Sequence, residues 1–393
     1  MKNSKKLVAL LLSLSMVFAL AACGGGSTAS PSPSASQPAP TESAPAETTP
    51  AAADFSVAMI TDYGDITDQS FNQTTYEACK AYCDANGVPF NYYKPAGDST
   101  AERVAMVEAA ADEGYNVIVM PGYAFGETIT QVAEEYADVT FIALDVGEGD
   151  LGDYTLPSNV YCAVYQEELC GYMAGYAAVK LGYTHLGFLG GMAVPAVVRY
   201  GYGFVQGADA AAVEAGADVT VEYVYGNQFF GDADITAYMD NWYQTLGVEV
   251  VFACGGGIYT SAAEAAAKVG GKVIGVDVDQ AGIIDGGYGE GMTVTSAMKG
   301  LAPTVEHILT EIAAGNFANY GGKIETLGLV SGDDPTANYV QIPMETTQWG
   351  DGFTQDDYKT LVKAMFDGTV TVSNDITAMP AVTITVNEYG NIK

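Results

Sequence analysis

The feature that most constrains the fold is a regular alternation of short apolar runs with longer amphipathic segments, which begins at Phe55. The apolar runs have the length of strands, and the amphipathic segments have the spacing of helices. Strands that are apolar on both faces and alternate with helices belong in parallel sheets that helices cover on both sides. The alternation therefore predicts an α/β protein. The predicted strands are 55–61, 116–120, 140–145, 159–164, 185–190, 219–225, 249–253 and 272–277, with a further one at 381–386.

Helix signals lie between these runs. Ser70 with Gln73, and Ser99 with Glu102, have the spacing of capping boxes. From Asp54 onward about 340 of the 393 residues remain, which is too many for one ordinary hydrophobic core. We therefore expect two lobes with a cleft between them. The predicted helices are 70–86, 99–113, 126–137, 167–181, one that ends near 216, 232–246, 259–269, 300–314 and 355–366.

The first 22 residues have the pattern of a bacterial lipoprotein signal peptide. Three lysines precede the apolar run 7–20, and small residues lead into Cys23. The run is shorter than the ~20 residues that span a bilayer, which argues against a permanent transmembrane helix. We expect Cys23 to become the lipidated first residue of the mature protein. Its acyl chains would anchor the protein to the cell membrane on the extracytoplasmic face.

A linker follows the lipidated cysteine. Residues 24–53 consist almost wholly of Gly, Ser, Ala, Thr and Pro, and six of them are proline. Such a segment has too little apolar surface to offset the entropy of ordering it. We therefore predict a disordered tether over 23–53 and a folded part that starts at Asp54.

The charge balance argues against nucleic acid as a partner. The chain has 48 acidic and 15 basic residues, and removal of the signal peptide lowers its net charge from −33 to −36. Binding of nucleic-acid phosphates depends on clustered Lys and Arg, which this surface does not supply. The acidity itself indicates no more than a soluble surface.

Sequence motifs of catalysis and metal binding are missing. The two histidines, His185 and His307, have no local partner for acid–base chemistry, and the cysteines lack the spacing of a zinc site. Cys79 and Cys83 are four residues apart on a predicted helix, which is typical of small core residues. The chain has no nucleophile elbow, phosphate loop or H-E-x-x-H pair. We therefore expect no enzyme, no metal and no cofactor.

Carboxylates, aromatics and glycines follow the predicted strands. In open α/β sheets a ligand binds outside the carboxyl ends of the strands. Aromatic rings stack on flat groups, carboxylates accept hydrogen bonds from hydroxyls, and glycines let backbone amides come close. This combination suits a neutral, polyhydroxylated ligand with a flat ring. The candidates at strand ends are Asp62, Tyr123, Asp145, Phe229, Phe230, Gly255, Gly256 and Asp277, and Lys299 follows Thr295-Ser296.

Three motifs stand in order behind the lipoprotein signal: 61–72, which ends in Phe71-Asn72, then 274–280 and 295–299. Together they resemble the basic membrane protein family of ABC-transporter substrate-binding lipoproteins, and the likeness extends from about Phe55 to Met344. The best understood branch of that family binds purine nucleosides. The resemblance implies a receptor that captures a nucleoside between two lobes and delivers it to an ABC permease. We also expect the protein to be a monomer.

The resemblance also implies the fold and the site. The fold would be the type I periplasmic binding protein fold, with two doubly wound parallel-sheet lobes. Lobe one would be 54–160 with part of 285–330, and lobe two 161–284 with part of 331–393. The residues that match the family's nucleoside cleft are Asp62, Phe71, Asn72, Asp145, Phe229 or Phe230, Gly255, Gly256, Asp277 and Lys299.

Alternatives stay open at this level. Asp62 and Asp145 could cap helices, Phe71 could be core, and Lys299 could be solvated. Asp277 and Asp279 stand close together at the end of a strand, and we expect only one of them to reach a ligand. The same fold could bind another small solute or serve as a surface sensor, and the Asp cluster could belong to a secreted nucleoside hydrolase.

Overall fold

The computed structural model describes residues 55–393. The predicted signal peptide (1–22), the lipidated Cys23 and the linker (23–53) lie outside these residues and remain predictions. No helix within the described part is both long and apolar enough to cross a bilayer.

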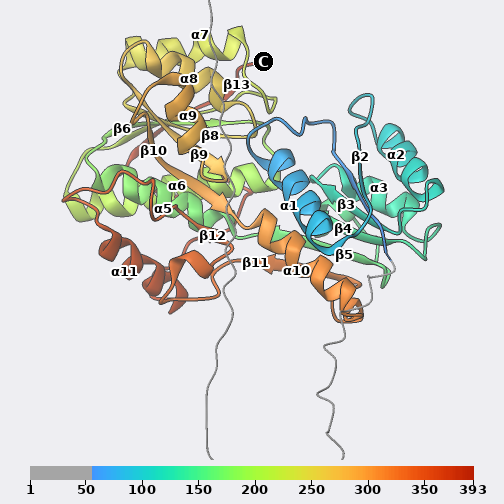
Figure 1. Ribbon diagram of the computed structural model, residues 1–393. Helices are drawn as coiled ribbons and strands as arrows, with labels where there is room; N and C mark the ends of the chain where they lie inside the picture. The colour runs from blue at the N-terminus through green and yellow to red at the C-terminus, as the bar shows by residue number, and fades with distance from the viewer. Residues whose placement is uncertain (1–54) are drawn as a thin grey trace, which may run out of the picture. The chain divides into compact units, whose positions relative to one another are not determined.

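The first sheet has six parallel strands in the order β11-β5-β4-β3-β1-β2. Its central strands are buried along nearly their whole length, as expected when helices cover both faces. Helices α1 and α10 pack on one face, and α2 and α3 on the other (Figure 1). The bounds are β1 (Val57–Ile60), α1 (Phe71–Asn86), β2 (Phe90–Tyr93), α2 (Thr100–Asp112), β3 (Val117–Pro121), α3 (Phe125–Val132), β4 (Thr140–Leu144), α4 (Glu148–Leu151), β5 (Val160–Tyr165), α10 (Leu301–Ala313) and β11 (Lys323–Leu327).

The second sheet has seven strands in the order β12-β10-β9-β8-β6-β7-β13. All are parallel except β12, which runs antiparallel to β10. Helices α7, α8 and α9 cover one face, and α5 and α6 the other (Figure 1). The bounds are α5 (Glu167–Lys180), β6 (His185–Gly190), α6 (Pro195–Ala215), β7 (Thr220–Tyr225), α7 (Ala233–Asn241), β8 (Val250–Cys254), α8 (Tyr259–Ala267), β9 (Lys272–Asp277), α9 (Ala281–Tyr288), β10 (Thr293–Lys299), β12 (Val340–Gln341), α11 (Gln355–Phe366) and β13 (Thr385–Asn391).

The predicted α/β class with two parallel-sheet lobes is confirmed. Within the described residues the chain passes between the sheets after β5, after β10 and after β11. Because β5 pairs with β4, residues 160–165 belong to the first sheet, beyond the 160/161 boundary expected from the sequence. Strand β10 belongs to the second sheet, although its residues fall in the range assigned in part to lobe one.

Several local predictions need correction. The strand expected at 381–386 lies at Thr385–Asn391, and β2 was missed because its residues, Phe-Asn-Tyr-Tyr, mix polar and half-exposed aromatic side chains. Ser99 is confirmed as the N-cap of α2, because its hydroxyl accepts from the Glu102 amide at 3.3 Å, but Ser70 makes no side-chain cap. Asp68 does so instead, because its carboxylate accepts from the backbone amides of Asn72 and Gln73 at 2.9 and 3.0 Å.

Helices α5 and α6 pack with their backbones almost in contact. A methyl group in place of the Gly203 hydrogen would lie 2.1 Å from the carbonyl oxygen of Glu168, and one at Gly171 would lie 2.2 Å from that of Tyr200. Only glycine allows such an approach. This packing fixes the start of α5 against the first turns of α6, and residues of those turns of α6 line the cleft.

Candidate functional site

A cavity of about 520 Å³ opens at the carboxyl ends of the strands of both sheets. Its position is the one that the parallel topology predicts for a ligand. Every ligand-contacting residue predicted from the sequence lies on its wall, namely Asp62, Phe71, Asn72, Tyr123, Asp145, Phe229, Phe230, Gly255, Gly256, Asp277 and Lys299.

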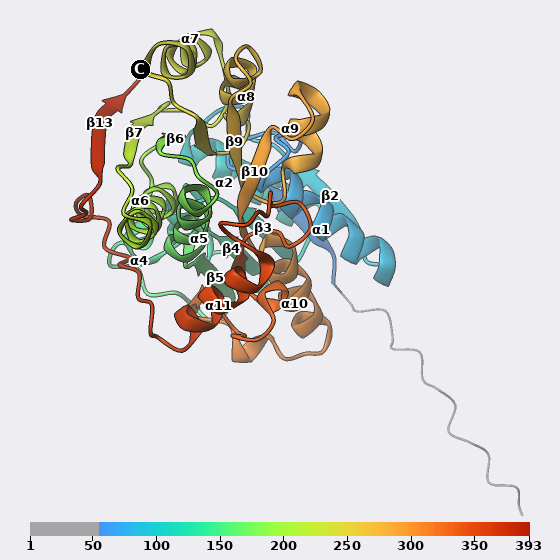
Figure 2. The same cartoon turned by 90° about the vertical axis from the view of Figure 1, so that its left-hand side faces the viewer.

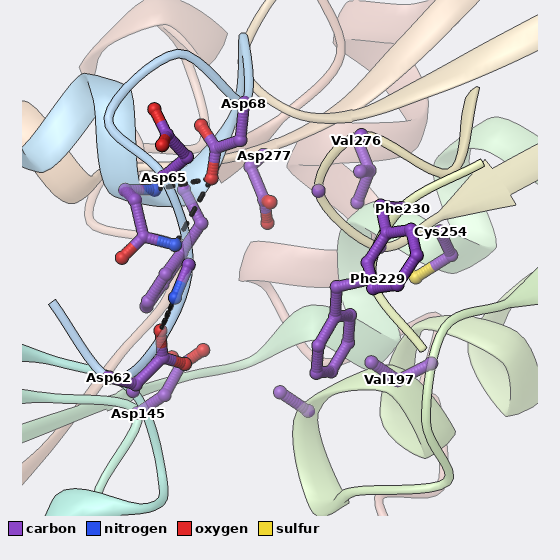
Figure 3. Close-up of a pocket in the computed structure, with 18 of the residues that line it drawn as sticks. Asp62, Asp65, Asp68, Asp145, Val197, Phe229, Phe230, Cys254, Val276 and Asp277 are labelled. Atoms are coloured by element: carbon purple, nitrogen blue, oxygen red, sulfur yellow. Dashed lines mark hydrogen bonds between the residues drawn. The ribbon is translucent and has the colours of Figure 1, made fainter. Parts of the chain in front are cut away.

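The cavity has two chemically different sides. Figure 3 shows the carboxylates of Asp62, Asp65, Asp68 and Asp145 gathered on one side. The opposite side is apolar and is formed by Val197, Phe229, Phe230, Cys254 and Val276. A ligand that fits both sides must present hydrogen-bond donors along one edge and an apolar surface along the other.

Asp62 is held by the backbone of its own loop. Its Oδ1 accepts from the amides of Tyr63 and Gly64 at 2.7 and 2.8 Å. Burial raises the pKa of this carboxyl, although the two amides oppose the shift. Gly122 makes room for the carboxylate, since a Cβ there would lie 2.9 Å from Oδ2. Asp62 therefore does not cap a helix.

Asn72 is oriented by Asp68. The Asp68 carboxylate accepts from the backbone amide and from Nδ2 of Asn72 at 2.9 and 3.1 Å. This leaves Asn72 Oδ1 buried without a hydrogen-bond partner, and Asp145 Oδ1 is in the same position. A buried acceptor without a partner is costly, and both side chains line the cavity. These two oxygens are ready to accept from a ligand.

Three residues of the cavity wall, Asp145, Asp277 and Lys299, belong to a cluster of buried charges. Together with Glu167 and Arg199, which lie behind the wall, we call them the central ion cluster. Lys299 Nζ lies 2.5 Å from Asp145 Oδ2, 3.5 Å from Glu167 Oε1 and 3.7 Å from Asp277 Oδ1. Glu167 also pairs with Arg199 at 2.6 Å. Lys299 is only 6% exposed, which excludes the solvated lysine considered above.

The charges in this cluster shift one another's protonation. Burial disfavours the charged form of Lys299, but the neighbouring carboxylates outweigh it and raise the pKa of this lysine. Burial raises the pKa of Asp145 to about 6, although Lys299 acts in the opposite direction. Lys299 also lies 4.7 Å from the centre of the Phe71 ring, so that ring is part of the cleft wall and not only core.

The carboxylates of Asp145 and Asp277 owe their direction to an unusual backbone. Their φ angles are 61° and 66°, in the left-handed region that non-glycine residues rarely adopt. Asp277 Oδ2 accepts from Ser70 Oγ at 2.7 Å, and its Oδ1 accepts from Tyr200 at 3.3 Å. Asp279 is exposed and accepts from Thr346 instead, so Asp277 is the acid at the cleft.

The two aromatic side chains after β7 differ in their surroundings. A Cβ at Gly191 would lie 2.4 Å from the Phe229 ring, and a Cβ at Gly255 would lie 3.0 Å from it. Phe230, in contrast, is 55% exposed. Gly255 and Gly256 have φ of 155° and 51°, so their backbone also favours glycine.

Sequence reasoning missed several residues of the site. Ser70 was interpreted as a helix cap, and Glu167 was only the first residue of a predicted helix. Tyr200 and Arg199 lie within an otherwise apolar helix and show no local pattern. Only the pairing across the two sheets reveals them.

Comparison with known proteins identifies the family of this chain. The family described as "ABC transporter substrate-binding protein PnrA-like" matches residues 55–333. The chain belongs to this family. The family is one of substrate-binding proteins and not of enzymes, and the resemblance inferred from the three motifs is confirmed.

Individual relatives are moderately similar. The ABC transporter nucleoside-binding protein BmpA of Lactococcus lactis is 27% identical over 296 residues, which cover 71% of this chain and 80% of that protein. The CD4+ T-cell-stimulating antigen of Listeria monocytogenes is 30% identical over 292 residues, covering 70% and 78%.

Solved structures share the fold. A solute-binding protein from Conexibacter woesei has a TM-score of 0.63 at 22% identity and covers 81% of this chain and 99% of its own. One from Aeropyrum pernix has a TM-score of 0.60 at 22% identity, with coverage of 82% and 88%.

Replacement of Lys299 by methionine should strongly destabilise the protein. The variant leaves the buried carboxylates of Asp145 and Asp277 without their cation, whereas Glu167 keeps Arg199. Loss of one partner of a buried ion pair typically costs about 3–5 kcal/mol. We expect a loss of that size in the free energy of unfolding, measured by urea denaturation. The matched control is Lys359→Met, which removes an exposed pair with Asp356 and should cost less than about 1 kcal/mol. Equal effects of the two variants would contradict a structural role for the cluster.

The raised pKa of Asp145 predicts a pH dependence of stability. An unfolded Asp titrates near pH ~4, whereas the folded pKa is about 6. Between these values the folded state binds more protons, so the contribution of this group to stability falls as pH rises from about 4 to about 6. The difference in unfolding free energy between the wild type and Asp145→Asn should decrease over this window. A difference that stays constant over this window would refute the shift.

Proposed function

We propose that the protein is a lipid-anchored, extracytoplasmic receptor that captures a purine nucleoside and delivers it to an ABC permease. Family membership identifies the chain as an ABC-transporter substrate-binding protein. The proposal that its ligand is a purine nucleoside rests on the cavity itself, which combines aromatic rings with buried hydrogen-bond acceptors that have no partner. We further propose that it acts as a monomer, without metal or cofactor.

The aromatic residues would bind the base. Phe71 comes from the first turn of α1 in the first lobe, and Phe229 follows β7 in the second lobe. Flat bases stack on such rings with a gain of roughly 1–3 kcal/mol each. We propose Phe229 rather than Phe230 as the second ring, because Gly191 and Gly255 hold it in place while Phe230 remains exposed.

The central ion cluster would bind the sugar. Each Asp277 oxygen accepts one hydrogen bond from a neighbouring hydroxyl and has capacity for another. Asp145 Oδ1 has no partner at all. Ribose hydroxyls would donate to these oxygens, and Lys299 would balance the negative charge beside them.

The charge of the cavity favours a neutral ligand. Lys94 and Lys299 are the cations on its wall, and both are already paired, Lys94 with Asp65 at 2.9 Å. No unpaired cation of the described wall remains for a phosphate group. Nucleoside monophosphates should therefore bind far more weakly than nucleosides.

Calorimetric titration with guanosine and inosine, using the protein without its signal peptide, tests this function. Phe71→Ala should weaken binding about 5- to 150-fold through loss of stacking. Asp277→Ala should weaken it about 10- to 150-fold through loss of charged hydrogen bonds. Asp279→Ala, the matched exposed acid, should bind like the wild type, and free bases should bind poorly.

Three outcomes would change the proposal. Unchanged affinity in Phe71→Ala and Asp277→Ala would remove these residues from the site. Absence of binding to any nucleoside would favour another solute or a sensor role. Release of free base in proportion to protein, abolished by Asp277→Ala, would indicate a hydrolase.

The anchor is tested separately. Cys23→Ala removes the residue that would carry the acyl chains, and without them the protein should be lost from the membrane fraction. Fractionation of expressing cells with a high-salt wash measures this, with Cys79→Ala as a control that leaves the signal intact. A Cys23→Ala protein that still sediments with membranes would contradict lipidation at this site.

A further inference from the structure

Strand β7 contains a buried carboxylate whose partners come mainly from the last strand of the chain. Glu222 is 4% exposed within an otherwise apolar strand. It accepts from Tyr389 at 2.6 Å and from Asn387 at 3.1 Å, both on β13, and His185 lies 2.9 Å away. A buried carboxylate is costly unless it is hydrogen-bonded. The position of Glu222 therefore requires β13, which makes this strand an integral part of the second lobe.

Strand β13 leads directly to the aromatic loop of the cleft. It pairs in parallel with β7 from Thr385 opposite Thr220 to Asn391 opposite Tyr225. Ile392 continues this contact by donating to the carbonyl of Tyr225 at 2.8 Å. The loop 227–232, which contains Phe229 and Phe230, begins just after Tyr225. Figure 2 shows β13 in red along the edge of the sheet and the chain end beside α7.

Lys393 then contacts both ends of this loop. Its Nζ pairs with Asp232 Oδ2 and lies 3.4 Å from Gln228 Oε1. Gln228 itself donates to the carbonyl of Phe230 at 2.8 Å and to Asp232 at 2.9 Å. The two aromatic residues thus lie between two side chains that Lys393 holds together.

Asp232 links the same loop to the helix behind it. Its Oδ1 accepts from the first-turn amides of Asp234 and Ile235, each at 3.0 Å, and so caps α7. The hydrogen bond from Lys393 is the main reason that the pKa of Asp232 is lowered to about 2. One carboxylate therefore joins the chain end, the aromatic loop and α7.

We infer that β13 and Lys393 form a C-terminal clasp that positions the loop 227–232 for ligand binding. Lys393 is a positioning residue, because it does not line the cavity and acts through Gln228 and Asp232. The clasp lies outside the residues that match the family, 55–333. A loop already held in its binding geometry loses less freedom when the ligand binds. The expected effect of the clasp on nucleoside affinity rests on the proposed function, whereas its expected effect on the loop 227–232 does not.

The test compares three variants of the protein with its full C-terminus. Lys393→Met removes the charge and keeps most of the chain length, Lys393→Arg restores the charge, and Lys359→Met removes an exposed lysine of α11 as the control. In calorimetric titration with guanosine, Lys393→Met should bind about 2- to 5-fold more weakly, the range expected for loss of one exposed ion pair. Lys393→Arg and Lys359→Met should bind like the wild type. The melting temperature of Lys393→Met should change by less than about 2 °C.

A second readout needs no ligand. Amide hydrogen exchange over 226–234 should be faster in Lys393→Met than in the wild type and normal in Lys393→Arg. Wild-type exchange and affinity in Lys393→Met, or failure of Lys393→Arg to restore them, would overturn the clasp. If the wild type binds no nucleoside, the proposed function fails, and the exchange experiment alone decides the clasp.

Discussion

The salt bridge between Lys299 and Asp145 joins the two sheets at the point where the ligand cavity is built. Lys299 ends β10 of the second sheet, and Asp145 follows β4 of the first. Around this pair, Glu167 and Asp277 complete a buried set of charges that neither sheet could hold alone. Removal of one member leaves uncompensated charge in a poorly hydrated site, which is why the arrangement tolerates little change. The floor of the cavity is therefore also a structural joint between the lobes.

The same joint explains why the site contains strained and unsatisfied groups. Asp145 and Asp277 occupy left-handed backbone conformations at equivalent positions, the carboxyl ends of β4 and β9. Buried oxygens of Asn72 and Asp145 have no protein partner. Such features persist where the surrounding structure imposes them, and they concentrate at functional sites. A ligand that donates hydrogen bonds to these oxygens would remove part of that cost.

The cleft depends on contacts from outside its own wall. The glycines of α5 and α6 allow the close helix packing that holds Glu167 and Arg199 behind Lys299. At the edge of the second sheet, β13 supplies hydrogen-bond donors to Glu222, and Lys393 reaches the loop that contains Phe229. Under the proposed function, both arrangements would support the cleft through contacts that the ligand itself does not make. The affinity of such a receptor would then depend partly on its scaffold.

Local sequence patterns were enough to predict the parallel α/β architecture and several residues of the cavity wall. The reason is that apolar strands, helix signals and polar strand ends are local features, and parallel topology brings all carboxyl ends to one edge. Asp62, Asp145 and Asp277 could be predicted in this way. Other features required the tertiary structure. Asp68 and not Ser70 caps α1, because the Ser70 hydroxyl donates to Asp277 from the other sheet. The partners of Lys299 and of Glu222 likewise come from distant parts of the chain. Ser70 and Asp277 are 207 residues apart. The sequence by itself thus determined the fold class and the candidate residues, whereas packing between the two sheets decided which of their polar atoms are paired and which remain for a ligand.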